Sequence, residues 1–164
     1  TDVADTTFPH VTFDDVLAAN REMAEHFRDE GLGDRAARGL ELVTCMDSRI
    51  DPLRIVGMAP GDVKILRNAG ARVTDDVLRT LVLAAYLLDV TRVLVLPHTR
   101  CKMVGTAEEE IHALIAEQYG VDTYSMEFRT VEDEVAALRR DLGTAPPSAG
   151  DALGLQREQA VEDQ

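Results

Sequence analysis

Cysteine, lysine and aromatic residues are scarce in this chain, and tryptophan is absent. Among 164 residues there are two cysteines, and aromatic residues make up 4%. Such a low cysteine content excludes a disulfide framework, and with 45% hydrophobic residues a chain of this length can bury a core without one. We therefore expect the two cysteines to serve metal binding or catalysis.

Long apolar runs are also missing. No stretch approaches the roughly 20 apolar residues that are needed to cross a bilayer, so we predict no transmembrane helix and no membrane partner. The first ten residues, TDVADTTFPH, contain neither a basic segment nor the apolar core of a signal peptide. We expect a cytoplasmic protein.

Positive charge is in short supply. The net charge is −13, and the only lysines are Lys64 and Lys102. Because phosphate backbones are bound by clustered Lys and Arg, we expect no nucleic-acid partner.

Short β-prone runs alternate along the chain with segments of helical periodicity. This alternation predicts one α/β domain over residues 1–142, with a small, mostly parallel sheet flanked by helices. The predicted strands are 40–44, 62–66 and 92–97, the predicted helices are 11–31, 75–88, 106–119 and 130–142, and 121–128 is ambiguous. Residues 143–164, rich in Pro, Gly, Ala and charge, are predicted to form a tail.

A group of metal-binding residue types follows the predicted strands. Cys45 follows the first strand, and His98 and Cys101 follow the third. Because parallel strands end at the same edge of a sheet, these residues are expected to meet at one rim. Two sulfurs and an imidazole are a typical zinc set, and they leave a fourth position for water. A lone His-x-x-Cys pair would be weak evidence, since free cysteines are commonly buried core residues.

The remaining histidines lie outside this group. We expect His10, His26 and His112 to be surface or helix-face residues rather than ligands.

The segment CMDSR adds a carboxylate and a guanidinium beside the first cysteine. If strand geometry continues past Thr44, side chains alternate and Cys45, Asp47 and Arg49 share one face. Arg49 could then hold Asp47 ionised through a two-pronged ion pair. A plain loop salt bridge is the alternative interpretation.

Three segments, CMDSRIDP, ILRNAGAR and VLPHTRCKMVG, resemble the signature segments of the β-class carbonic anhydrases in order and spacing, over residues 38–105. The resemblance implies a β-carbonic-anhydrase-like fold, a Zn²⁺ ion held by Cys45, His98 and Cys101, and a catalytic dyad of Asp47 and Arg49. It also implies reversible hydration of carbon dioxide to bicarbonate in a homodimer or a dimer of dimers.

Two thiolates should make such a zinc a weaker Lewis acid than three histidines would. Asp47 is therefore expected to orient the zinc-bound hydroxide, while Arg49 keeps that carboxylate away from the metal. If the pair breaks, Asp47 could become the fourth ligand and close the site.

The loop 67–72 and Lys102 are candidate contacts for substrate or anion. Asn68, Ala69 and Gly70 can turn backbone amides inward as an anion-binding nest, although an ordinary strand-to-helix turn explains them equally well. Lys102 could attract an anionic product, or its side chain could simply point to solvent.

Three features depart from the family pattern. Lys102 stands where relatives usually have glycine, and Pro97 stands where they commonly have the glycine before the zinc histidine. The C-terminal end is also atypical, because no β-run follows 130–142, which predicts a missing edge strand. Hydrolysis of carbonyl sulfide or carbon disulfide, and a non-catalytic zinc-binding role, are therefore alternatives.

Overall fold

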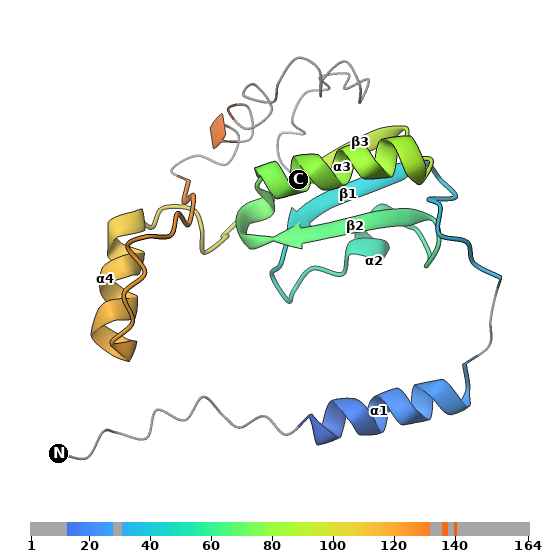
Figure 1. The fold of residues 1–164 in the computed structure, drawn as a ribbon, viewed down its shortest axis with the longest axis horizontal. Coiled ribbons are helices and arrows are strands. Elements are labelled where there is room, and N and C mark those ends of the chain that lie inside the picture. The colour runs from blue at the N-terminus through green and yellow to red at the C-terminus, as the bar shows by residue number, and fades with distance from the viewer. Residues whose placement is uncertain (1–12, 28–30, 132–135, 138–139, 141–164) are drawn as a thin grey trace.

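A computed structural model of the chain describes residues 13–27, 31–131, 136–137 and 140 (Figure 1). The predicted tail 143–164 lies outside these residues, as does most of the predicted helix 130–142. The sheet of the described part has three strands, in the order β2-β1-β3.

The central strand β1, Leu40–Cys45, pairs in parallel with both neighbours. On one side Cys45 lies opposite Asn68 of β2, Val63–Asn68, and on the other Thr44 lies opposite Leu96 of β3, Arg92–Leu96. The predicted fold class, a small parallel sheet with helices in a single α/β domain, is confirmed.

Three of the predicted helices are present. Two have ends within two residues of the prediction, whereas the helix predicted over 11–31 ends already at Glu25. The three helices are α1, Asp14–Glu25; α3, Asp75–Leu87; and α4, Glu108–Tyr119. The Thr74 hydroxyl accepts a hydrogen bond from the Val77 amide at 3.4 Å and so caps the start of α3. The end of α4 is marked by Gly120 at φ 67°, a left-handed conformation that glycine adopts without strain.

The sequence patterns missed two elements and left a third open. A short helix α2, Pro52–Val56, begins where the Asp51 carboxylate caps the Arg54 amide. The strand β2 runs on through Asn68 and is followed by a 3₁₀ turn η1, Ala69–Ala71, so residues 67–72 are not a simple loop. The ambiguous stretch 121–128 forms turns and contains no strand.

Helix α3 covers one face of the sheet (Figure 1). The buried core between them consists of Val43, Val73, Val77 and Leu81. Full burial of such side chains is worth about 1.5–3 kcal/mol each, so this layer holds β1 in place.

Helix α1 lies apart from the sheet in Figure 1, and none of its residues is buried. Its apolar side chains therefore stay open to solvent in the described part of the chain. The exposed apolar side chains of this segment are Phe13, Val16, Leu17, Met23 and Phe27. None of the described helices has the length and apolar character that a membrane span requires.

One carboxylic acid lies inside the sheet layer. Glu41, at the middle strand, is 1% exposed, and its Oε2 atom has no hydrogen-bond partner among the described residues. Burial raises the pKa of Glu41 to about 7, although the nearby Lys64 ammonium opposes this shift. The Lys64 ammonium itself donates to the carbonyl oxygen of Asp34.

This buried acid makes stability depend on pH. In the folded chain Glu41 stays neutral up to about pH 7, whereas in the unfolded chain it ionises from its ordinary pKa of 4.5. The free energy of unfolding should therefore fall as the pH rises between these two values. Glu41→Gln is neutral at every pH. At pH 8 its free energy of unfolding should exceed that of the parent by on the order of 3 kcal/mol, and its melting temperature should be higher; at pH 5 the gain should be much smaller.

Scanning calorimetry at both pH values measures this difference. Glu117→Gln, at an exposed position of α4, is the matched control and should gain nothing at either pH. An equal gain for Glu41→Gln at pH 5 and pH 8 would contradict the assignment.

Candidate metal centre

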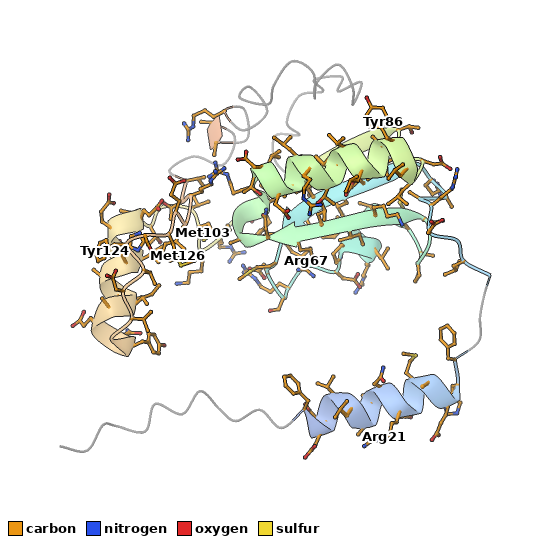
Figure 2. The ribbon with its side chains drawn as sticks, viewed as in Figure 1. Arg21, Arg67, Tyr86, Met103, Tyr124 and Met126 are labelled. Carbon is orange, nitrogen blue, oxygen red and sulfur yellow. The ribbon has the colours of Figure 1, made fainter. Side chains whose placement is uncertain are left out.

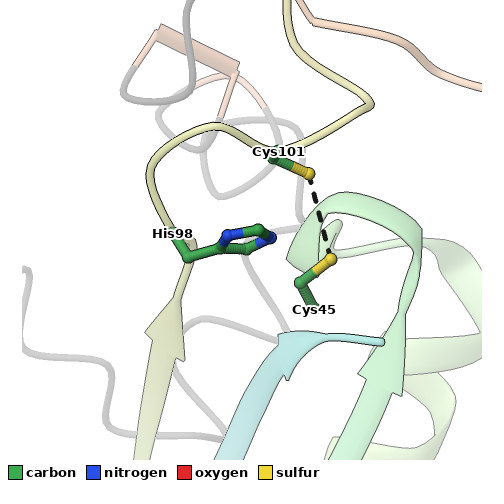
Figure 3. Close-up of side chains that lie close together, drawn as sticks. All are labelled: Cys45, His98 and Cys101. Atoms are coloured by element: carbon green, nitrogen blue, oxygen red, sulfur yellow. Dashed lines mark hydrogen bonds between the residues drawn. The ribbon is translucent and has the colours of Figure 1, made fainter. Parts of the chain in front are cut away.

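Three side chains converge at the carboxyl ends of the strands (Figure 3). The sulfur atoms of Cys45 and Cys101 and a ring nitrogen of His98 all lie within 4.8 Å of one another. Cys45 is the last residue of β1, and the other two belong to the turn after β3. The two sulfurs are 3.9 Å apart, far beyond the roughly 2.05 Å of a disulfide bond. Both cysteines are thiols and are buried.

The ring of His98 is oriented for a metal. Its Nδ1 atom lies 3.0 Å from the carbonyl oxygen of Thr99, an acceptor that places the proton on Nδ1. The other nitrogen, Nε2, is buried and has no hydrogen-bond partner among the described residues. A buried nitrogen lone pair without a partner is costly, and a bound cation would satisfy it.

The chemistry of this donor set fits zinc. Two sulfurs and one imidazole nitrogen suit a tetrahedral zinc ion and leave one position open. Burial raises the pKa of the Cys45 thiol, but hydrogen bonds from the backbone amides of Gly70 and Asp47, with His98 and Cys101 close by, bring that pKa below its ordinary value. A thiol that gives up its proton readily is a better metal ligand.

The Asp47 carboxylate lies beside this cluster and is held by Arg49. Its Oδ1 atom accepts hydrogen bonds from the backbone amide of Arg49 at 2.9 Å and from Nε at 2.8 Å, and Oδ2 accepts from Nη2 at 2.6 Å. This two-pronged pair holds the pKa of Asp47 well below its usual range. Oδ2 is 3.9 Å from Nε2 of His98, so the ionised carboxylate faces the position a metal would occupy.

The turn after β2 supports the sulfur ligand. Gly70, at φ 81°, donates its amide proton to the Cys45 sulfur at 3.4 Å. A Cβ at this position would lie 3.2 Å from the Cβ of Met103, which is tighter than ordinary contact. Glycine is thus favoured both by its backbone angle and by the space.

The side chain of Asn68 is engaged within the same turn. Its amide donates to the carbonyl oxygen of Arg72 at 2.7 Å and accepts from the Arg72 amide at 2.8 Å. The expected anion contacts of Asn68, Ala69 and Gly70 stay a prediction. Lys102 is exposed beside the buried Cys101, which leaves both interpretations of its side chain open.

A basic residue that the sequence patterns did not single out lies below the dyad. Arg67, the residue before the end of β2, is labelled in Figure 2. It donates from Nε to the carbonyl oxygen of Cys45 at 3.0 Å and from Nη2 to that of Asp47 at 2.6 Å. The parallel register, in which Arg67 lies opposite Thr44, is the signal that could have indicated this.

The other described histidines stay away from the cluster. His26 is exposed at the end of α1. His112 is on a helix, as expected, but it is a core residue, 5% exposed and stacked on Tyr124 with a centroid distance of 4.7 Å. Its Nδ1 atom is 2.8 Å from the Thr123 hydroxyl, so the turns of 121–128 bury it against α4. His10 lies outside the described residues.

Comparison with known proteins identifies the family of the chain. A family model described as carbonic anhydrase matches residues 41–149. Beta-carbonic anhydrase 1 of Mycobacterium tuberculosis is 35% identical over 130 residues, which cover 77% of this chain and 79% of that protein. The chain belongs to the β-carbonic anhydrase family. The crystal structure of carbonic anhydrase from Streptococcus mutans shares its fold, with a TM-score of 0.76 and 32% identity over 86% of each chain.

The relatives of this chain do not all carry the name of the same activity. Carbon disulfide hydrolase from Saccharolobus solfataricus is 36% identical over 74 residues, which cover 45% of this chain and 36% of that protein. Membership of the family therefore leaves the reaction of this chain to be tested.

The orientation of His98 generates a prediction about zinc. The metal-free chain should bind one zinc ion, and His98→Gln should weaken binding by more than the roughly 10–100-fold that loss of an outer hydrogen-bond partner costs, because a direct ligand is removed. Competition with a chromophoric chelator measures the affinity. His26→Gln, at the exposed end of α1, should bind zinc as the parent does. Equal zinc affinity in the two variants would exclude His98 as a ligand.

Proposed function

We propose that this chain is a zinc-dependent carbonic anhydrase that reversibly hydrates carbon dioxide to bicarbonate and a proton. The observation that carries the proposal is the unpartnered Nε2 of His98, which lies beside two thiols and faces an ionised carboxylate. A purely structural zinc site does not require an ionised carboxylate beside the metal. The pairing of Asp47 with Arg49 therefore favours catalysis over the non-catalytic alternative.

In this proposal Cys45, His98 and Cys101 hold the metal. Zinc bound there would supply a Lewis acid that lowers the pKa of a coordinated water, so that hydroxide is available near neutral pH. The attacking oxygen forms a new bond to the carbon of carbon dioxide, and the electron pair of one C=O π bond moves onto its oxygen. The proton given up by the attacking water passes to solvent.

The dyad orients the attacking oxygen. Asp47 stays ionised because Arg49 holds it by three hydrogen bonds, so Oδ2 can accept a hydrogen bond and fix the direction of the oxygen lone pair. Were that pair to break, the carboxylate would need to move only a short way to reach the ligand atoms, since Oδ2 is 3.9 Å from Nε2 of His98. We propose that closure of the site by Asp47 takes this route.

A homodimer, or a dimer of dimers, is the assembly that we propose. The apolar side chains of α1 are exposed in one chain, and a second copy would cover them. A reducing, cytoplasmic setting suits the site, because both thiols must stay reduced to bind zinc.

Carbon disulfide hydrolysis is the second candidate. The similarity to a carbon disulfide hydrolase over 74 residues favours it, since the same attack on a linear substrate carbon would release hydrogen sulfide. Carbonyl sulfide would react in the same manner.

The proposed role of Asp47 is tested by Asp47→Asn in protein of measured zinc content. Carbon dioxide hydration, followed by stopped flow, should fall by about 100-fold or more, because an amide cannot take the place of a carboxylate acceptor. Zinc content should stay at the level of the parent. Asp76→Asn removes a carboxylate that pairs with Arg79 at 2.9 Å on the surface of α3, and it should leave the rate unchanged.

The same assays separate the two substrates. Fully zinc-loaded parent that hydrates carbon dioxide no faster than buffer would reject the carbonic anhydrase proposal. Hydrogen sulfide release from carbon disulfide by that preparation would then support the second candidate, and its absence would leave the non-catalytic role.

A further inference from the structure

Arg67 connects the metal centre to the sheet. Its guanidinium donates one hydrogen bond to the carbonyl oxygen of a metal-binding residue, Cys45, and another to that of the dyad residue Asp47. The next residue of β2 adds a third bond, because the Asn68 carbonyl accepts from the amide of Met46 at 2.9 Å. The three-residue segment between ligand and dyad is thus held from β2 at every residue.

The pairing of Asp47 with Arg49 cannot supply this connection. The two residues are two positions apart, so their ion pair fixes the carboxylate relative to its own turn and leaves the turn free to shift against the ligands. The contact of Arg49 with the third-strand loop is weaker, since Nη2 is 3.5 Å from the Arg100 carbonyl oxygen. The two short bonds from Arg67 come from a paired strand, which is a rigid base.

The direction of Arg67 agrees with this role. Its neighbour Leu66 packs against the core under α3, so the alternation of side chains along β2 places Arg67 on the opposite face. There the guanidinium donates to the Cys45 carbonyl oxygen at the end of β1 and to that of Asp47, which also accepts from the Ile50 amide at 3.0 Å.

We infer that Arg67 is a positioning residue that fixes the distance between the metal ligand Cys45 and the carboxylate of Asp47. This inference rests on the proposed function, in which that distance decides whether Asp47 orients the attacking oxygen or moves toward the metal. Arg67 touches neither substrate nor metal in this role.

Arg67→Ala tests the inference in the zinc-loaded full chain. Loss of such an outer partner should lower kcat by about 10–100-fold, leave KM unchanged and weaken zinc binding by about tenfold in a chelator competition. Because the cavity left behind has the shape of a guanidinium group, millimolar guanidinium chloride should restore part of both kcat and zinc affinity. Arg67→Lys, which can reach one carbonyl oxygen at a time, should fall between the parent and Arg67→Ala.

The matched control is Arg79→Ala, which removes an exposed arginine of α3. It should behave as the parent and show no response to guanidinium. If Arg67→Ala matches this control, or if its defect is accompanied by a lower melting temperature and is not relieved by guanidinium, the inference is overturned. Zinc affinity and its rescue are read without turnover, so they decide on Arg67 even if the parent proves inactive toward carbon dioxide.

Discussion

The parallel pairing of β1 with both of its neighbours is the constraint on which the candidate metal centre depends. Cys45 ends β1 opposite Asn68, and Leu96 lies opposite Thr44, so the turns that follow all three strands open at one edge. A shift of one residue between β1 and β3 would turn Cys45 away from His98. The core layer under α3 makes such a shift costly, since it would expose Val43.

The metal-binding edge is held mainly by the backbone and by arginine rather than by bulky packing. Gly70 contacts the Cys45 sulfur, Arg67 holds two carbonyl oxygens and Arg49 holds Asp47. Directional bonds of this kind set positions to within tenths of an ångström, which hydrophobic contact alone does not. The acidic chain thus places guanidinium groups where a negatively charged ligand set and carboxylate need balance.

Local patterns predicted the three strands to within two residues at each end, because apolar runs and their turn signals are local properties. They did not predict Arg67, since the reach of its side chain depends on which residue lies opposite in the register. The burial of His112 was missed for a similar reason: Tyr124 and Thr123 cover it from another segment. Helix α2 has only five residues, too few to show a periodicity.

The scarcity of lysine has a practical consequence for handling the protein. The Lys64 ammonium donates to the Asp34 carbonyl oxygen and is partly covered, whereas Lys102 is exposed next to Cys101, a proposed zinc ligand. Amine-directed reagents will therefore favour Lys102 among the lysine side chains. Dyes, crosslinkers or solid supports coupled through lysine will attach directly beside Cys101, so attachment chemistry for this chain is better aimed at surface carboxylates.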